Sequence, residues 1–182
     1  MLDTGIRTSH VDFGGRAVKG WSAGCQGGSC EMGWLPDGVI DGTIGCNGHG
    51  THCSSTIGGT TYGVSKSVEL VAVQVLDCWG SGSEAGVLGG IQWAVDQARA
   101  GGRPAIISMS LGGDKWPAGN RAVDAAHDAG VVVVVAAGND DADACDYSPA
   151  SAVKAITVGA TTSSDSRSDF SVPTADRTSD LH

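Results

Sequence analysis

Apolar and polar positions along the chain predict strands that alternate with helices. Short apolar runs that predict strands lie at 70–76, 105–109, 131–137 and 155–160, and the near-continuous run at 131–137 is typical of a strand buried on both faces. Helices are expected at 48–57, 84–100 and 117–129, and glycines follow the last two. Strands that alternate with helices imply right-handed crossovers and a mostly parallel sheet with helices on both faces. The pattern therefore predicts an α/β fold.

Other segments carry no such pattern. Residues 1–3 resemble the end of a strand, and residues 14–46, rich in Gly, Cys and Trp, are expected to form a long surface loop. From Ser163 onward the chain is polar, and we expect it to be unpacked and disordered.

Composition narrows the class of protein. With 29 Gly but only 2 Phe and 2 Tyr, the core must be built from Val, Ile, Leu and Ala. A net charge of −9 and the lack of any Lys or Arg run argue against nucleic acid or an anionic membrane as a partner. No stretch approaches the ~20 apolar residues of a membrane span.

The six cysteines favour an oxidising compartment, and their spacing does not form the paired C-x-x-C knuckles of a zinc module. No signal peptide follows Met1, so an export signal would lie outside this chain.

Asp3-Thr4-Gly5 ends the first predicted strand. By itself this string is weak evidence for any one function, because aspartic proteases carry the same three residues. That alternative requires an all-β fold and a second Asp-[Thr/Ser]-Gly, and the sequence indicates neither.

The string Asn47-Gly48-His49-Gly50-Thr51-His52-Cys53 is more specific. A histidine at the start of a helix, flanked by glycines, lies where a substrate backbone can approach. The helix N-terminus carries partial positive charge and therefore disfavours a protonated histidine. A carboxylate is needed to stabilise the imidazolium when His49 takes a proton, and Asp3 is the candidate. The competing hypothesis is a metal site made by Cys46, His49, His52 and Cys53, although these residues crowd one short stretch. We interpret His52 as a structural, packed residue.

Two further motifs, Ser108–Gly113 and Ala136–Asn139, follow predicted strands. Active sites of open α/β sheets lie at the carboxyl ends of strands, so these small residues are candidates for pocket walls.

Together these motifs resemble the subtilisin family of serine peptidases, and within it the proteinase K-like branch near its aqualysin group. The matching stretches, which extend the likeness to about residue 171, are Asp3–Ile6, Gly48–Cys53, Tyr62–Val64, Val75–Cys78, Gly80–Ser83, Ser110–Gly113, Ala136–Asn139, Tyr147–Ala150 and Thr157–Ala160. The resemblance implies a peptidase domain over residues 1–171, incomplete at both ends, and a divergent, disordered tail at 172–182.

The resemblance also implies roles for the site residues. Asp3 would orient His49, His49 would act as general base and then acid, and Asn139 would donate to the oxyanion. The expected binding segment for an extended substrate and the walls of the pocket before the scissile bond are Ser110, Leu111, Gly112, Ala136, Ala137 and Gly138.

The sequence departs from the family after Ser171. The family nucleophile lies in Gly-Thr-Ser-Met-Ala, and this string is absent from the 182 residues. We therefore expect the chain to be inactive by itself, as a truncated gene product or, alternatively, as a non-catalytic peptide-binding relic. The family's structural calcium site, held partly by backbone at 153–155, would be incomplete, and no cofactor is needed for the chemistry.

By resemblance we expect a secreted monomer whose partners are extended peptide or protein substrates, its own propeptide or protein inhibitors, with no nucleic acid or membrane. The family pairing also implies a Cys46–Cys78 disulfide, a buried thiol at Cys53 and an unbridged Cys145. Cys25 and Cys30 are candidates for a local bridge.

Overall fold

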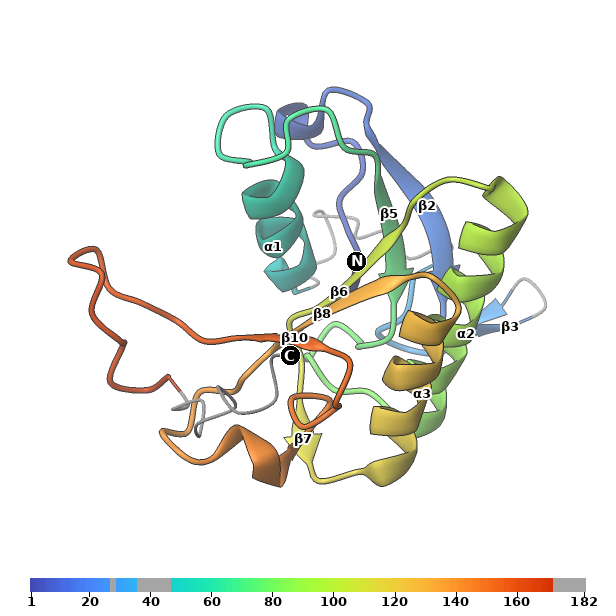
Figure 1. The fold of residues 1–182 in the computed structure, drawn as a ribbon. Helices are drawn as coiled ribbons and strands as arrows, with labels where there is room; N and C mark the ends of the chain where they lie inside the picture. The colour runs from blue at the N-terminus through green and yellow to red at the C-terminus, as the bar shows by residue number, and fades with distance from the viewer. Residues whose placement is uncertain (27–28, 36–46, 172–182) are drawn as a thin grey trace. The chain divides into compact units, whose positions relative to one another are not determined.

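Two three-stranded parallel sheets organise the computed structural model, which describes residues 1–26, 29–35 and 47–171. Contacts divide the chain into two units, Met1–Gly101 and Gly102–His182, and each unit is built on one of these sheets (Figure 1). Parallel strands joined through helices confirm the predicted α/β fold.

The first unit is a sheet with a helix on each face. Its parallel strands, in spatial order, are β1 (Leu2–Asp3), β5 (Leu70–Gln74) and β2 (Ala17–Ser22). Helix α1 (His49–Gly58) packs through Cys53 and Ile57 on a buried cluster that includes Phe13 of the short helix η1 (Val11–Phe13). On the other face, Gly90 of α2 (Glu84–Gly101) lies against Val73 and Val75.

Strand β2 corrects the prediction of a continuous loop over 14–46. Polar Lys19 and the shift in register between Lys19 and Trp21 hide any alternation of apolar residues. Gly20 is required there, because a Cβ at this position would lie 2.3 Å from the Ala72 carbonyl oxygen. The strand therefore depends on its pairing with β5, and the local sequence pattern alone does not specify it.

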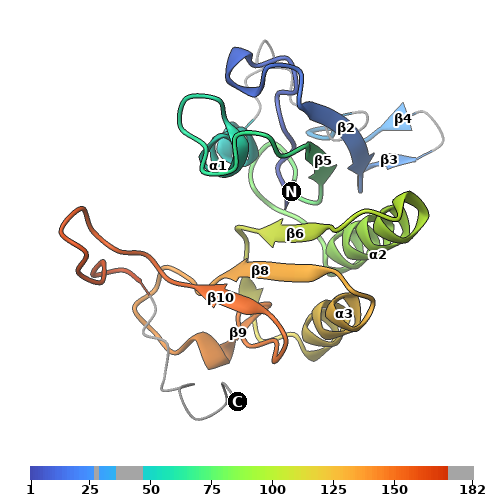
Figure 2. The ribbon, with the colours of Figure 1, turned by 45° about the horizontal axis from the view of Figure 1, so that its top comes forward.

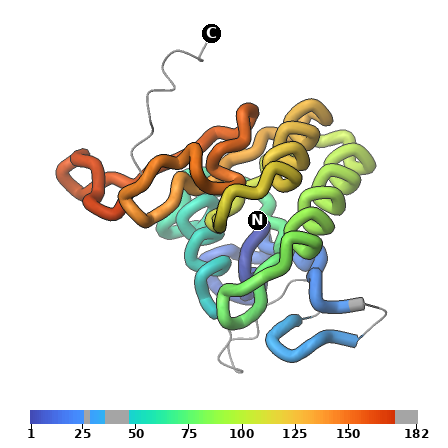
Figure 3. Tube along the Cα trace, turned by 90° about the horizontal axis from the view of Figure 1, so that it is seen from below, coloured from blue at the N-terminus to red at the C-terminus, as the bar shows by residue number. Residues whose placement is uncertain are grey.

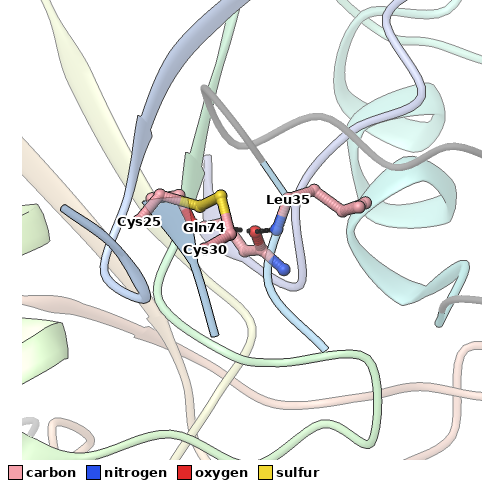
Figure 4. Close-up of a disulfide and its surroundings, with 5 residues drawn as sticks. Cys25, Cys30, Leu35 and Gln74 are labelled. Carbon is pink, nitrogen blue, oxygen red and sulfur yellow. Dashed lines mark hydrogen bonds between the residues drawn. A yellow bond between two sulfur atoms is a disulfide. The ribbon is translucent and has the colours of Figure 1, made fainter. Parts of the chain in front are cut away.

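A disulfide-bonded hairpin follows β2. Strands β3 (Cys25–Gln26) and β4 (Ser29–Cys30) pair antiparallel, and the Cys25–Cys30 disulfide joins them (Figure 4). The Leu35 amide then donates to the Gln74 side-chain oxygen at 3.0 Å, which ties the segment after the hairpin to β5 (Figure 4). The candidate local bridge is thus confirmed.

The other cysteines largely follow the expectation. Cys145 is a thiol outside any disulfide, as predicted. Cys78 is disulfide-bonded, whereas its expected partner, Cys46, lies outside the described residues.

The second unit is built on a parallel sheet, against which helix α3 (Pro117–Asp128) packs in the part that the structure describes (Figure 2). Its strands, in spatial order, are β10 (Ile156–Val158), β8 (Val132–Ala136) and β6 (Ile106–Met109). Helix α3 packs on β8. A small antiparallel ribbon, which the sequence did not predict, joins β7 (Gly113–Asp114) to β9 (Tyr147–Ser148), just after the short helix η3 (Ala144–Asp146).

The two faces of this second sheet differ in burial. Val133 and Val135 are at most 2% exposed, whereas Ile106 is 68% and Ile156 is 54% exposed. Alternating residues of a strand point to opposite faces, so one face is covered and the other presents aliphatic side chains. The interpretation of the 131–137 run as a strand buried on both faces is therefore wrong, because Val132 on the second face is 41% exposed.

The prediction that the chain is disordered from Ser163 onward is wrong for residues 163–171. Thr161 bridges to Arg167 within the segment that forms the red loop in Figure 3. Arg167 also pairs with Asp141 at 2.6 Å. Ser171 is 1% exposed, and its hydroxyl accepts from the Ala160 amide at 2.8 Å. Long-range polar contacts order this segment, while the expected tail at 172–182 lies outside the described residues.

Among the helices of the described part of the chain, none is both long and apolar enough to span a membrane.

Candidate active site

Asp3 ends strand β1 with its side chain fully buried. The Thr4 amide donates to Asp3 Oδ1 at 2.6 Å. Gly5, with φ +96°, then turns the chain in a conformation that disfavours residues with a Cβ. A buried carboxylate is therefore held at the end of a strand and aimed by the turn that follows it.

His49 is the first residue of α1. The residue before the helix is Gly48, which has no side chain to cap the helix, and instead the Asn47 side-chain oxygen accepts from the His49 amide at 3.0 Å. The polar residue at the start of the helix therefore fixes the backbone from which the imidazole projects.

Asp3 and His49 form a hydrogen-bonded pair, which confirms their expected proximity. His49 Nδ1 lies 2.7 Å from Asp3 Oδ1 and 2.9 Å from Oδ2. Because an ionised carboxylate only accepts hydrogen bonds, Nδ1 carries the proton and Nε2 is left as the acceptor in the neutral ring. The imidazole side chain is 46% exposed, so it is accessible to solvent, while the carboxylate is buried.

This arrangement suits general-base chemistry. A proton taken up at Nε2 would make an imidazolium whose charge is offset by the buried carboxylate at Nδ1.

The thiol of Cys53 lies beside the same imidazole. Its Sγ is 3.8 Å from His49 Nε2 and 4.0 Å from Nδ1, one helical turn along α1. Cys53 is half-buried, so the expectation of a buried thiol is wrong, and the imidazole beside it is also partly exposed.

The structure brings together a different set of possible metal ligands from the four residues that the sequence suggested. Cys46 lies outside the described residues and His52 is exposed, which also corrects its interpretation as a packed residue. Asp3, His49 and Cys53 do bring one ligand atom each within 4.8 Å of one another. However, Nδ1 is engaged by Asp3, and a sulfur almost equally distant from both ring nitrogens lies off the Nε2 lone-pair axis. These three groups therefore suit an acid–base pair with a packed thiol better than a shared metal ion.

The remaining predicted residues lie in the second unit. Ser110, Leu111 and Gly112 directly follow β6, and Ala136 is the last residue of β8. Ala137 is buried, and Gly138, with φ +115°, leads to the exposed Asn139. Because β6 and β8 are parallel neighbours, both segments leave the same edge of this sheet (Figure 2).

Comparison with known proteins decides the family. The model of the subtilase family matches residues 1–176. The chain belongs to the subtilase family. The family and the fold that the resemblance implied are thereby confirmed.

Individual subtilases are similar over most of this chain. It is 53% identical to an extracellular serine proteinase of Thermus sp. (strain Rt41A), over 94% of this chain and 38% of that protein. It is 47% identical to alkaline serine exoprotease A of Vibrio alginolyticus, over 94% of this chain and 29% of that protein. A solved cold-adapted subtilisin-like serine proteinase superposes with a TM-score of 0.82 at 44% identity, over 94% of this chain and 57% of that one. The chain thus spans about two-fifths or less of the length of the Thermus and Vibrio proteins.

Sequence reasoning missed two contributors to the site, the Thr4 hydroxyl and the Asn47 side chain. Both stand inside the quoted motifs, next to the residues with predicted roles. A polar residue such as Asn47, just before a helix whose capping residue is glycine, is a recognisable capping signal, whereas the long-range contact of Thr4 has no local signature.

Proposed function

We propose that this chain is part of a secreted subtilase that hydrolyses peptide bonds, with Asp3 and His49 as two members of its catalytic triad. The observation that carries the proposal is the hydrogen bonding of His49 Nδ1 to the buried Asp3 carboxylate at 2.7 and 2.9 Å, which leaves Nε2 as the acceptor.

In the proposed reaction, His49 Nε2 takes the proton of a serine hydroxyl as that oxygen attacks the scissile carbonyl. The Asn139 side-chain amide donates to the oxyanion that develops, and the imidazolium, stabilised by Asp3, then protonates the leaving amine. Ser110–Gly112 would pair with the extended substrate, and Ala136–Gly138 would line the pocket beside it. The chemistry requires no metal ion.

The nucleophile is the group that these residues do not supply. The 182 residues contain no Gly-Thr-Ser-Met-Ala string, so the serine would have to come from another part of a complete domain. We propose that the 182-residue polypeptide by itself forms no acyl-enzyme. In subtilisin, loss of the serine or of the histidine alone lowers kcat about 10⁶-fold.

Two observations support secretion of the parent protein. The Thermus relative is named as an extracellular proteinase, and Cys25 and Cys30 form a disulfide, which persists in oxidising compartments. We propose peptides or proteins in an extended conformation as substrates, with a propeptide or protein inhibitors as further partners of a monomer. We also propose that the family's structural calcium site is incomplete in this chain.

Covalent labelling with a fluorophosphonate, which reacts with activated serines, tests the proposal. The 182-residue chain should remain unlabelled. A chimera that joins residues 1–171 to the C-terminal remainder of the Thermus proteinase should be labelled, and His49→Ala should abolish that labelling. A folded chimera that resists labelling would show that the proposed function is wrong. Stoichiometric labelling of the 182-residue chain, lost in His49→Ala, would mean that another serine such as Ser110 acts as nucleophile.

A further inference from the structure

The first backbone N–H groups of any helix need acceptors from outside the helix. In α1 the capping position is Gly48, which has no side chain for this purpose. The Gly50 amide instead donates to Thr4 Oγ1 at 3.1 Å, from a residue 46 positions earlier in the chain. Thr4 is 1% exposed, so water does not compete for this contact. A strand-end hydroxyl thus caps the helix that carries His49.

Thr4 makes two further hydrogen bonds to this site. Its hydroxyl donates to the Asn47 carbonyl at 3.2 Å, and its amide donates to Asp3 Oδ1 at 2.6 Å. One residue therefore contacts the carboxylate directly and the backbone on both sides of His49.

We propose that Thr4 is a positioning residue for the Asp3–His49 pair. Its amide orients the Asp3 carboxylate, and its hydroxyl holds the start of α1 at the distance at which Nδ1 reaches that carboxylate. A β-branched threonine suits this role because its χ1 angle is restricted, so the hydroxyl is held in place. This inference rests on the proposed function for the meaning of the pair, but it concerns geometry that can be measured without catalysis.

The test compares the wild-type 182-residue chain with Thr4→Val, which keeps the shape but removes the hydroxyl, and Thr4→Ser, which keeps the hydroxyl. Thr56→Val is the matched control, because Thr56 lies on α1 itself and its hydroxyl donates within the helix, to the His52 carbonyl at 3.2 Å. Nuclear magnetic resonance would follow hydrogen exchange of the Gly50 amide and the resonance of the His49 Nδ1 proton.

In Thr4→Val we expect the Gly50 amide to exchange about 10- to 100-fold faster, as for a buried donor that loses its acceptor. The His49 Nδ1 proton signal should shift or broaden, since its distance to Asp3 is no longer held. Thr4→Ser should restore both signals, and Thr56→Val should change neither. Faster Gly50 exchange with an unchanged His49 signal would show that Thr4 caps the helix without positioning the pair, and would overturn the proposal.

A measurement on the wild-type chain keeps the test decisive if Thr4→Val does not fold. The Thr4 hydroxyl proton should exchange slowly and show a nuclear Overhauser effect to the Gly50 amide. Its absence would overturn the inference. Because neither readout needs a nucleophile, a failed chimera-labelling experiment and a failed Thr4 experiment are distinguishable.

Discussion

Replacing Gly50 with alanine probes how closely α1 approaches the strand end that carries Asp3. A Cβ at Gly50 would lie 2.2 Å from the Gly5 carbonyl oxygen, 3.0 Å from Asp3 Oδ1 and 3.1 Å from Asp3 Cβ. The first of these contacts is with backbone, which cannot rotate aside. The helix start must therefore move away from the strand end, and His49 must move with it.

The size of the effect follows from two opposing contributions. Overpacking of a closed site costs ~1–3 kcal/mol, and the backbone contact places Gly50→Ala near the upper end. Alanine gains up to ~1 kcal/mol over glycine in helix propensity. The expected net loss of stability is about 2 kcal/mol, which in a chain of this length lowers Tm by about 4–8 °C.

Thermal and urea unfolding of the 182-residue chain would measure this loss, with Gly101→Ala as the matched control. Gly101 is also a helix residue, but a Cβ there would meet nothing within 4 Å, so only the propensity gain should remain. The His49 Nδ1 proton signal should also change in Gly50→Ala and not in Gly101→Ala. If the two variants are equally stable, the close approach of α1 to Gly5 is refuted.

Two further predictions concern other parts of the chain. The Ser55 hydroxyl at 2.6 Å, followed by the Thr61 amide at 2.7 Å, lowers the pKa of Asp12 below its ordinary value. The ionised carboxylate therefore adds stability that is present above the unfolded pKa of ~3.9 and is lost as pH falls through the lower folded pKa. Urea titrations from about pH 6 to about pH 2.5 should show a weaker pH dependence in Asp12→Asn, and equal slopes would contradict this. Ile156 lies on the solvent-exposed apolar face of the second sheet, so Ile156→Lys should reduce both binding of the dye ANS and self-association. Val11→Lys, at an exposed residue of the first unit, is the control and should change neither. Unchanged dye binding in Ile156→Lys would mean that this face is not the accessible apolar surface.

The parts of the fold that could be predicted are those with local apolar patterns. The run at 131–137 became β8, and the segment at 84–100 became α2, each within about one residue of the expected bounds. Strand β2 and the 163–171 segment could not be predicted, because distant partners form them. Lys19 sits in a strand only through its pairing with β5, and Arg167 is held by Asp141.

The same division holds for the candidate site. A carboxylate after a strand and a histidine at a helix start are visible as motifs, and their proximity was predicted and is observed. The contact of the Cys53 thiol with the His49 ring and the capping of Gly50 by Thr4 depend on the angle at which α1 meets β1. That angle is set by packing of the whole first unit, so neither contact has a signature in a short motif.

The division of the chain into two units shows which contacts hold Asp3 and His49 in place. Asp3, Thr4, His49 and Gly50 all belong to the first unit, as do the partners of the hydrogen bonds described for them. The hydrogen bonds that hold Asp3 and His49 together therefore all lie within the first unit. A buried carboxylate is costly unless it is hydrogen-bonded, and here the Thr4 amide and the His49 ring provide those bonds. These bonds offset the cost of burying the Asp3 carboxylate within its own unit, which gives a physical reason for the geometry of the pair to persist in a chain whose sequence holds no family nucleophile.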